Sequence, residues 1–141
     1  SPTVTRTVLA RNVFTGVLTV LENKIKASEY TGVKSCTIGY HCDNKVVVPT
    51  KGYNFRFFEE DIDWPNHTEF HLRMYRRFPE GYVPHGILLL DDRNQIVSLY
   101  ESAKEFKDFS GLTEGALSFR IRTGKTWNGY RLRRFDPIGT L

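Results

Sequence analysis

The chain has 141 residues, 40% of them hydrophobic and 26% charged, and a formal net charge of +4. These values are typical of a soluble globular protein of one domain or two very small ones, and they exclude a disordered or low-complexity chain. No apolar run approaches the roughly 18 residues of a membrane span, and the first residues do not read as a signal peptide, so we expect a cytoplasmic protein.

Alternating and β-branched residues predict a β-hairpin at the start of the chain. Residues 7–14 form its first strand, Thr15-Gly16 the turn, and residues 17–20 the second strand. Asn23 then stands where a helix N-cap belongs, ahead of a helix of about two turns over residues 24–30 that ends at Thr31-Gly32.

A second helix is expected from Lys34, with Ile38 and Cys42 buried at positions i and i+4. Cys36 and Cys42, the only two cysteines, fall on different faces of this helix, so we expect both to be reduced thiols. After a loop and Gly52, residues 53–58 return as a strand that alternates aromatic or apolar side chains with basic ones.

The segment 59–85 begins as an acidic stretch and turns at Trp64-Pro65-Asn66. Within residues 69–78, Phe70, Leu72 and Met74 alternate as in a strand, whereas Phe70, Met74 and Phe78 fit a helical stripe. The periodicity therefore leaves both conformations open, and we interpret the segment as a linker.

Residues 86–135 repeat the order of the first 58. A strand over residues 86–90, a turn at Asp92-Arg93-Asn94 and a second strand precede an N-cap at Ser102 and a helix over residues 103–109. Ser110-Gly111 ends that helix, and a second one from Thr113 buries Leu117 and Ile121. The last strand covers residues 130–135, and no acidic residue interrupts the basic ones from Gly115 to Phe135.

Four segments of the two copies align in the same order at an offset of 79, which becomes 77 after the second helix. The sequence therefore predicts an α+β protein of two tandem small modules, each with a β-hairpin, a helix-turn-helix and a closing basic strand. The expected boundaries are residues 1–58 for the first module, 59–85 for the linker and 86–141 for the second module.

The module resembles the NUMOD-type repeats, the nuclease-associated DNA-binding modules in the tails of phage and organellar homing endonucleases. In the second copy, Ser102-Ala103-Lys104-Glu105, Gly111-Leu112-Thr113 and Asn128-Gly129-Tyr130 carry the resemblance. In the first copy, Gly32-Val33-Lys34-Ser35 and Lys51-Gly52-Tyr53 carry it, with a departure at Asn23-Lys24-Ile25 and a longer loop. It covers residues of about 8–58 and 86–135.

The resemblance implies sequence-directed binding of double-stranded DNA, with the second helix of each pair in the major groove. The outward positions that would face base edges are Lys34, Ser35, Thr37 and Tyr40 in the first copy and Thr113, Glu114, Ala116 and Phe119 in the second. Glu114 has an alternative role in stabilising the helix dipole, and the alternative for Tyr40 and Phe119 is burial in the core.

Basic residues around these helices are the expected phosphate contacts, although scattered cations can equally form a solvated face. They are Arg120, Arg122, Lys125, Arg131 and Arg133, with Lys45, Lys51 and Arg56 from the first copy. In the linker, Arg73, Arg76 and Arg77 would belong either to a basic connector that crosses or enters a minor groove or to an ordinary packed strand.

No pattern of catalytic residues is recognisable, so we expect a binding protein that is not an enzyme and needs no cofactor. His67 and His71 stand at i and i+4 without a zinc-protease motif around them, and the two cysteines lack the spacing of a metal pair. A nuclease of the HNH or GIY-YIG kind, a phosphate loop and a Ser/His/Asp arrangement are also not evident.

The leading hypothesis is a regulator of phage or mobile-element DNA that acts in the cytoplasm or nucleoid of a bacterial host, either in transcription regulation or as a competitor for a homing site. One alternative is a phage protein-binding module that inhibits a host enzyme, with exposed aromatic residues as anchors. The start Ser1-Pro2-Thr3 fits a natural beginning after removal of methionine, and it equally fits the targeting fragment of a homing endonuclease.

Overall fold

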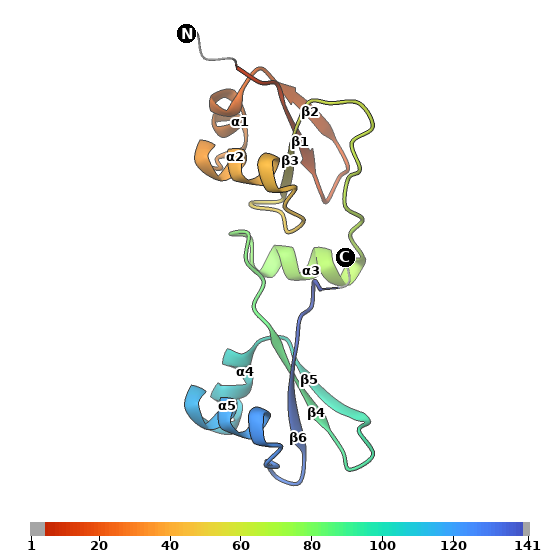
Figure 1. The fold of residues 1–141 in the computed structure, drawn as a ribbon, viewed down its shortest axis with the longest axis vertical. Helices are drawn as coiled ribbons and strands as arrows, with labels where there is room; N and C mark the ends of the chain where they lie inside the picture. The colour runs from red at the N-terminus through yellow and green to blue at the C-terminus, as the bar shows by residue number, and fades with distance from the viewer. Residues whose placement is uncertain (1–4, 140–141) are drawn as a thin grey trace. The chain divides into compact units, whose positions relative to one another are not determined.

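A computed structural model describes residues 5–139 as two compact units that divide between Val83 and Pro84. Residues 1–4 and 140–141, and with them the start Ser1-Pro2-Thr3, lie outside the described part. Within residues 5–139 the protein is α+β, with two three-stranded antiparallel sheets and five helices, which confirms the predicted fold class (Figure 1).

The first unit is a sheet with two short helices on one side of it. Strands β1 (Val8–Asn12) and β2 (Leu18–Leu21) form the hairpin, followed by helices α1 (Lys24–Thr31) and α2 (Ser35–Asn44). Strand β3 (Tyr53–Phe57) then returns beside β1, which gives the order β2-β1-β3. The remaining element of this unit is helix α3 (Glu69–Arg77).

The second unit repeats this arrangement (Figure 1). Its elements are β4 (Gly86–Leu90), β5 (Ile96–Tyr100), α4 (Ala103–Ser110), α5 (Glu114–Thr123) and β6 (Arg131–Phe135), with the strand order β5-β4-β6. The register repeats as well, because Ala10 lies opposite Phe55 in the first sheet and Leu89 lies opposite Leu132 in the second. These pairs differ by 79 and 77 positions, the offsets of the sequence alignment.

The ends of α1 and α4 are fixed by the residues that the sequence indicated. The side chain of Asn23 accepts a hydrogen bond from the Lys26 amide, and Ser102 accepts one from the Glu105 amide. Gly32 and Gly111 close the two helices in the left-handed region, at φ of 80° and 78°. The predicted caps are therefore confirmed in both units.

A tight turn precedes each closing strand. Lys51-Gly52 and Asn128-Gly129 all have positive φ, with values of 50° and 84° in the first turn and 49° and 84° in the second. Two successive residues with positive φ make a type I′ turn, in which glycine is favoured because it has no Cβ. This requirement explains why the Gly-Tyr pair recurs at the start of both closing strands.

Strand β1 is shorter than the predicted residues 7–14 because Asn12 ends it. The side-chain oxygen of Asn12 accepts hydrogen bonds from the amides of Phe14 and Thr15, at 2.9 and 3.1 Å. Those amides therefore bend into a turn instead of continuing the sheet.

Each unit has its own hydrophobic core between the sheet and its two helices, built from corresponding positions. Ile38 and Leu117 are fully buried at the centres of α2 and α5. The sizes of the other members compensate one another, since Ala27 and Phe55 in the first unit correspond to Phe106 and Leu132 in the second. Two different combinations of side chains thus fill the core of the same backbone arrangement to close packing.

The segment expected to be a linker contains helix α3, which resolves the ambiguous periodicity. Met74 and Tyr75 face inward from this helix and are buried, while Arg76 and Arg77 are exposed. Within the described residues, none of the helices is both long enough and apolar enough to cross a membrane.

Replacing the central core residue of the second unit tests its packing. Leu117→Ala should lower the free energy of unfolding by about 2–5 kcal/mol, because it removes a fully buried side chain and leaves a cavity. Phe119→Ala, on the exposed side of the same helix, is the matched control and should change it by about 0.5 kcal/mol or less. Chemical denaturation measures both values, and equal losses would contradict this assignment of the core.

Candidate nucleic-acid interface

Strand β6 divides its basic residues between two faces of the second sheet. Side chains alternate along a strand, and Leu132 points into the core between sheet and helices. Arg134 points to the same side and donates a hydrogen bond of 2.7 Å to the Glu114 carboxylate of α5. Arg131 and Arg133 therefore lie on the opposite face, where both are exposed.

A second group of cations lies at the C-terminal end of α5. Arg120 donates a hydrogen bond to the backbone oxygen of Thr126, and the guanidinium of Arg122 lies 5.8 Å from the centre of the Phe119 ring. Lys125 follows in the exposed loop after the helix. Cations in the last turn also interact favourably with the helix dipole, so this group has a structural role beside any binding role.

These five predicted phosphate contacts share the absence of an anionic partner. In the part of the chain that the structure describes, Arg120, Arg122, Lys125, Arg131 and Arg133 form no salt bridge. The contact of Arg131 is with a neutral group, because its Nη1 donates to Asn94 Oδ1 at 2.9 Å. Within residues 5–139 no carboxylate is paired with any of the five, and the fold separates them into a helix-end group and a sheet-face pair.

Glu114, a predicted base-reading residue, is engaged inside the second unit. Its carboxylate accepts hydrogen bonds from Lys107 and Arg134 at 2.9 and 2.7 Å. These bonds, that of Lys107 first, lower the pKa of Glu114 to about 2. Thr113 is also engaged, since its hydroxyl accepts a hydrogen bond from the Ala116 amide and caps α5. Thr113, Glu114 and Phe119 are all exposed, but Thr113 and Glu114 are held by these hydrogen bonds.

Tyr40 and Phe119 occupy the same position in α2 and α5, and both face solvent. Their exposed fractions are 62% and 46%, which excludes the alternative that they belong to the core. Lys34 is exposed at the start of α2, whereas Ser35 and Thr37 are half-buried.

The predicted phosphate contacts of the first unit have partners within that unit. Lys45 forms an ion pair with Glu59 at 3.5 Å, and the ammonium of Lys51 donates to the backbone oxygen of Gly32 at 2.9 Å. Arg56 is only 4% exposed, and its Nη1 donates to the backbone oxygens of Val46 and Phe55. The assignment of Arg56 as a phosphate contact is therefore wrong, because its guanidinium is buried and its hydrogen bonds stabilise the unit.

Trp64 explains the burial of Arg56. Arg56 and Arg11 lie on the sheet face opposite the helices, and their guanidinium carbons are 5.7 and 6.0 Å from the centre of the Trp64 ring. Arg11 also donates to the backbone oxygen of Pro65 at 3.2 Å. This part of the face is thus covered by residues 64–65, which follow the acidic stretch.

His67 connects this covering segment to β3 and α3. The Asn54 amide nitrogen donates to Val47, which leaves its Oδ1 to accept from His67 Nε2 at 2.9 Å. His67 Nδ1 must then accept the hydrogen bond from the Tyr75 hydroxyl at 3.0 Å, so the imidazole is neutral. Burial, with smaller contributions from Arg11 and His71, lowers the pKa of His67 to about 4.

Hydrogen bonds within the first unit occupy ring nitrogens of both His67 and His71. His71 Nδ1 accepts from the Thr68 amide in a capping box at the start of α3, and both ring nitrogens of His67 are already hydrogen-bonded. Among residues 5–139, no three His, Cys, Asp or Glu side chains form a group suited to a metal ion.

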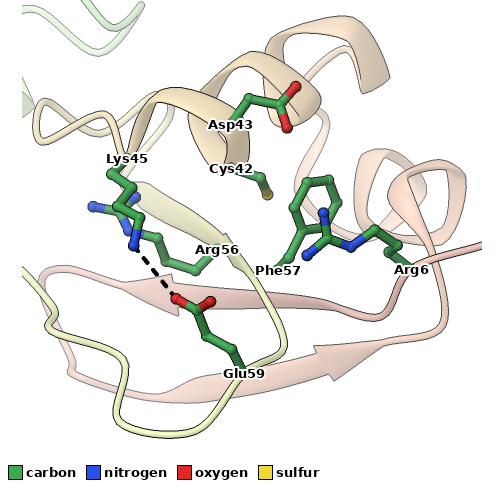
Figure 2. A pocket seen from close by; sticks show the side chains of 7 residues that line it. All are labelled: Arg6, Cys42, Asp43, Lys45, Arg56, Phe57 and Glu59. Carbon is green, nitrogen blue, oxygen red and sulfur yellow. Dashed lines mark ion pairs between the residues drawn. The ribbon is translucent and has the colours of Figure 1, made fainter.

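A hollow of about 180 Å³ lies between the end of α2 and the first sheet, as Figure 2 shows. Arg6 covers the Phe57 ring at 3.8 Å on one side, and the Lys45–Glu59 pair lies on the other. Burial raises the pKa of the Cys42 thiol to about 11, so the thiol is protonated at neutral pH and is a weak nucleophile. The hollow therefore has mixed charge and no activated group.

The basic residues of α3 are exposed on a helix whose arginines stack on rings. The guanidinium carbons of Arg73, Arg76 and Arg77 lie 5.2, 4.5 and 5.1 Å from the ring centres of Phe70, Phe14 and Phe78. A helix with side chains is about 10–12 Å wide, whereas a minor groove is about 6 Å wide. The helix itself is therefore too wide to enter a minor groove, and the packed-strand alternative is wrong. That the connector crosses a minor groove and contacts it through these arginines stays a prediction.

Sequence reasoning missed two features of these surfaces. One is the cover by Trp64, which depends on contacts between residues far apart in the chain. The other is a set of exposed apolar side chains at corresponding positions of β2 and β5, which are Leu18, Val20, Val97 and Leu99. Their recurrence at the offset of 79 was a signal that could have revealed the second feature.

No family model matches the chain, and no curated protein or solved structure matches it.

The lowered pKa of His67 predicts that acid destabilises the first unit. The unfolded chain takes up a proton near pH 6.5, but the folded one does so only near pH 4, so stability is present above about pH 6.5 and falls as the pH drops. The loss between pH 7 and pH 4 should reach at most about 3 kcal/mol from this residue. Denaturant titrations of the full chain at several pH values measure it.

His67→Gln should flatten this pH dependence, because the amide does not titrate between pH 7 and pH 4. Asn66→Gln, at the exposed neighbour of His67, is the control and should leave the slope unchanged, because neither amide titrates. Burial also lowers the pKa of His41, so a residual slope is expected in the His67 variant. An unaltered slope after the His67 substitution would contradict the assignment.

Proposed function

We propose that this protein binds double-stranded DNA and that the second unit supplies most of the electrostatic attraction. The observation that carries the proposal is the set of five exposed or half-exposed cations of that unit without a carboxylate partner among the described residues. DNA phosphates are the polyanion that such a set suits, and each phosphate contact adds salt-sensitive affinity.

The contrast between the units supports this choice of the second one. In the first unit, Lys45 is paired with the Glu59 carboxylate, and Arg56 is buried with its Nη1 on the backbone oxygens of Val46 and Phe55. A cation that must break an ion pair or leave a buried site before it reaches a phosphate gains less free energy from binding than one with an exposed neutral partner, such as Arg120 or Arg131. The first unit is therefore expected to add selectivity more than attraction.

In the first unit, we propose α2 as the element that contacts base edges. Lys34 and Tyr40 are exposed on its outward side, and the opposite face of the sheet is partly covered by Trp64. Arginine, lysine and apolar groups that enter the major groove recognise guanine edges and thymine methyl groups. The chain would bind without cleaving, as a regulator or a competitor at a site in phage or mobile-element DNA.

A protein-binding function is the second candidate, and the exposed apolar side chains favour it. Tyr30 and Phe109 are 54% and 67% exposed at corresponding positions of α1 and α4, and the apolar residues of β2 and β5 are exposed on the other face of each sheet. Aromatic side chains of this kind are frequent anchors in protein interfaces. This candidate predicts association with a protein that persists at high salt and does not depend on the five cations.

The DNA proposal predicts that retention of the full chain on duplex DNA falls steeply as salt rises. Replacing Arg120, Arg122 and Lys125 together by Gln should weaken binding to all sequences and reduce the slope of log K against log salt by about 2–3. Electrophoretic mobility shifts or fluorescence anisotropy over a salt series measure both effects.

A matched triple variant separates binding from loss of structure. Arg6, Lys26 and Lys104 are exposed cations that lie neither on α2 and α5 nor in the second sheet, and their replacement by Gln removes the same formal charge. It should change affinity less than the first variant does. Absence of retention on DNA even at low salt would rule out the proposed function.

A further inference from the structure

The face of the second sheet that points away from α4 and α5 is the surface of this unit most suited to a DNA groove. Across it, the register aligns Arg133 with Leu88 and Leu99, and Arg131 with Leu90 and Ile96. Leu88 and Leu90 lie on the central strand β4 of this face and are buried. One edge of the face therefore carries two arginines and the other carries exposed apolar side chains.

We propose that this sheet face, rather than α5, lies in the major groove and reads base pairs there; this inference rests on the proposed function. Arg131 and Arg133 are the reading residues on β6, and Val97 and Leu99 on β5 contact thymine methyl groups.

The spacing of the two arginines matches the spacing of base pairs. Residues two apart on a strand are separated by about 6.6 Å, and base pairs two steps apart are separated by about 6.8 Å. Bidentate hydrogen bonds from an arginine to guanine are the commonest specific contact in the major groove. The outer strands of a three-stranded sheet are about 10 Å apart, which is less than the width of the major groove of about 12 Å.

The orientation of this face is already partly fixed by contacts in the free protein. Arg131 is held by Asn94 in the turn between β4 and β5. The carboxylate of Asp91 accepts hydrogen bonds from the amides of Arg93 and Gln95 and so stabilises this turn. On the opposite edge, Val97 and Leu99 are 50% and 45% exposed.

The first unit shows what the corresponding positions can bind. Arg56 corresponds to Arg133, and there the ring of Trp64 packs against the guanidinium. Arg133 is exposed instead. At this strand position, the arginine of the first unit is thus covered by an aromatic ring. The arginine of the second unit is exposed and can reach a partner.

Helix α5 is the less suitable reader because the side chains at its N-terminal end are bound within the unit. Glu114 is fixed by Lys107 and Arg134 and also accepts from the Ser118 hydroxyl at 3.2 Å. The carboxylate is therefore not free to accept a hydrogen bond from a cytosine amino group. Among its large outward side chains, Phe119 is apolar and has Arg122 beside its ring.

The experiment selects bound sequences from a random duplex pool with the full chain and then repeats the selection with Arg131→Gln and Arg133→Gln. Each substitution should reduce discrimination at one base pair by roughly 5- to 150-fold, and the two affected base pairs should lie two steps apart. Arg122→Gln, on the exposed side of α5, is the matched control and should weaken binding without changing base preference. Circular dichroism of each variant checks that it folds.

Methylation of guanine N7 in the selected site gives an independent readout, because N7 lies in the major groove. Methylation at either base pair should abolish the preference of the wild-type chain there. Each arginine variant should be insensitive to methylation at the base pair that its missing arginine reads, and should stay sensitive at the other. If wild type binds and selects a site but Arg122→Gln alone changes the preference, α5 is the reader and the sheet inference is overturned.

Insensitivity to N7 methylation would also overturn the sheet inference while leaving DNA binding intact. If the wild-type chain retains no duplex at low salt, the proposed function itself fails, which the first selection round reveals before any variant is compared.

Discussion

The alternation of side chains along the closing strand of each unit decides which charges can meet a partner. On β6, Leu132 completes the core and Arg134 binds Glu114, so the residues between and beside them must face the other way. On β3, Phe55 completes the core and Arg56 faces the other way in the same manner. An acid-free run of residues therefore does not become one basic surface, because the fold distributes it over two faces.

The two units differ in what lies on the second face of the sheet. In the first unit, Trp64 packs against Arg11 and Arg56, and the chain Tyr75–His67–Asn54 fixes the covering segment through hydrogen bonds. Breaking such a buried polar chain leaves unpaired groups, which is costly in free energy. The first unit thus uses Arg11 and Arg56 for its own stability. In the second unit, Leu90 stands in the place of Arg11 and is buried, while Arg133 stands in the place of Arg56 and is exposed.

Local rules were sufficient to predict most of the fold. Asn23 and Ser102 at the helix starts, the glycines after them and the Gly-Tyr turns act through neighbouring backbone groups, so the sequence alone indicates them. The burial of Ile38 and Leu117 followed from helical spacing. Helix α3 was ambiguous because its capping box uses His71, where Glu or Gln is the usual signal.

The candidate site was less predictable because it depends on contacts between distant residues. Nothing in the spacing of β3 shows that Trp64 covers Arg56, or that Glu114 binds Arg134, which is 20 residues away. Charge patterns could identify basic residues but could not show which of them already have partners. The presence or absence of a partner within the fold separates cations that stabilise the structure from cations that can bind a ligand.

The repeated register has a consequence for how such a chain can change over generations. Because both sheets pair in the same way, with or without the cover of Trp64, the cover is an addition to the scaffold and not a condition for it. Selection can therefore act on the covering segment separately from the duplicated fold. In a duplicated module of this kind, one copy can keep the residues that stabilise its own fold. The other copy can then change the residues that contact a partner.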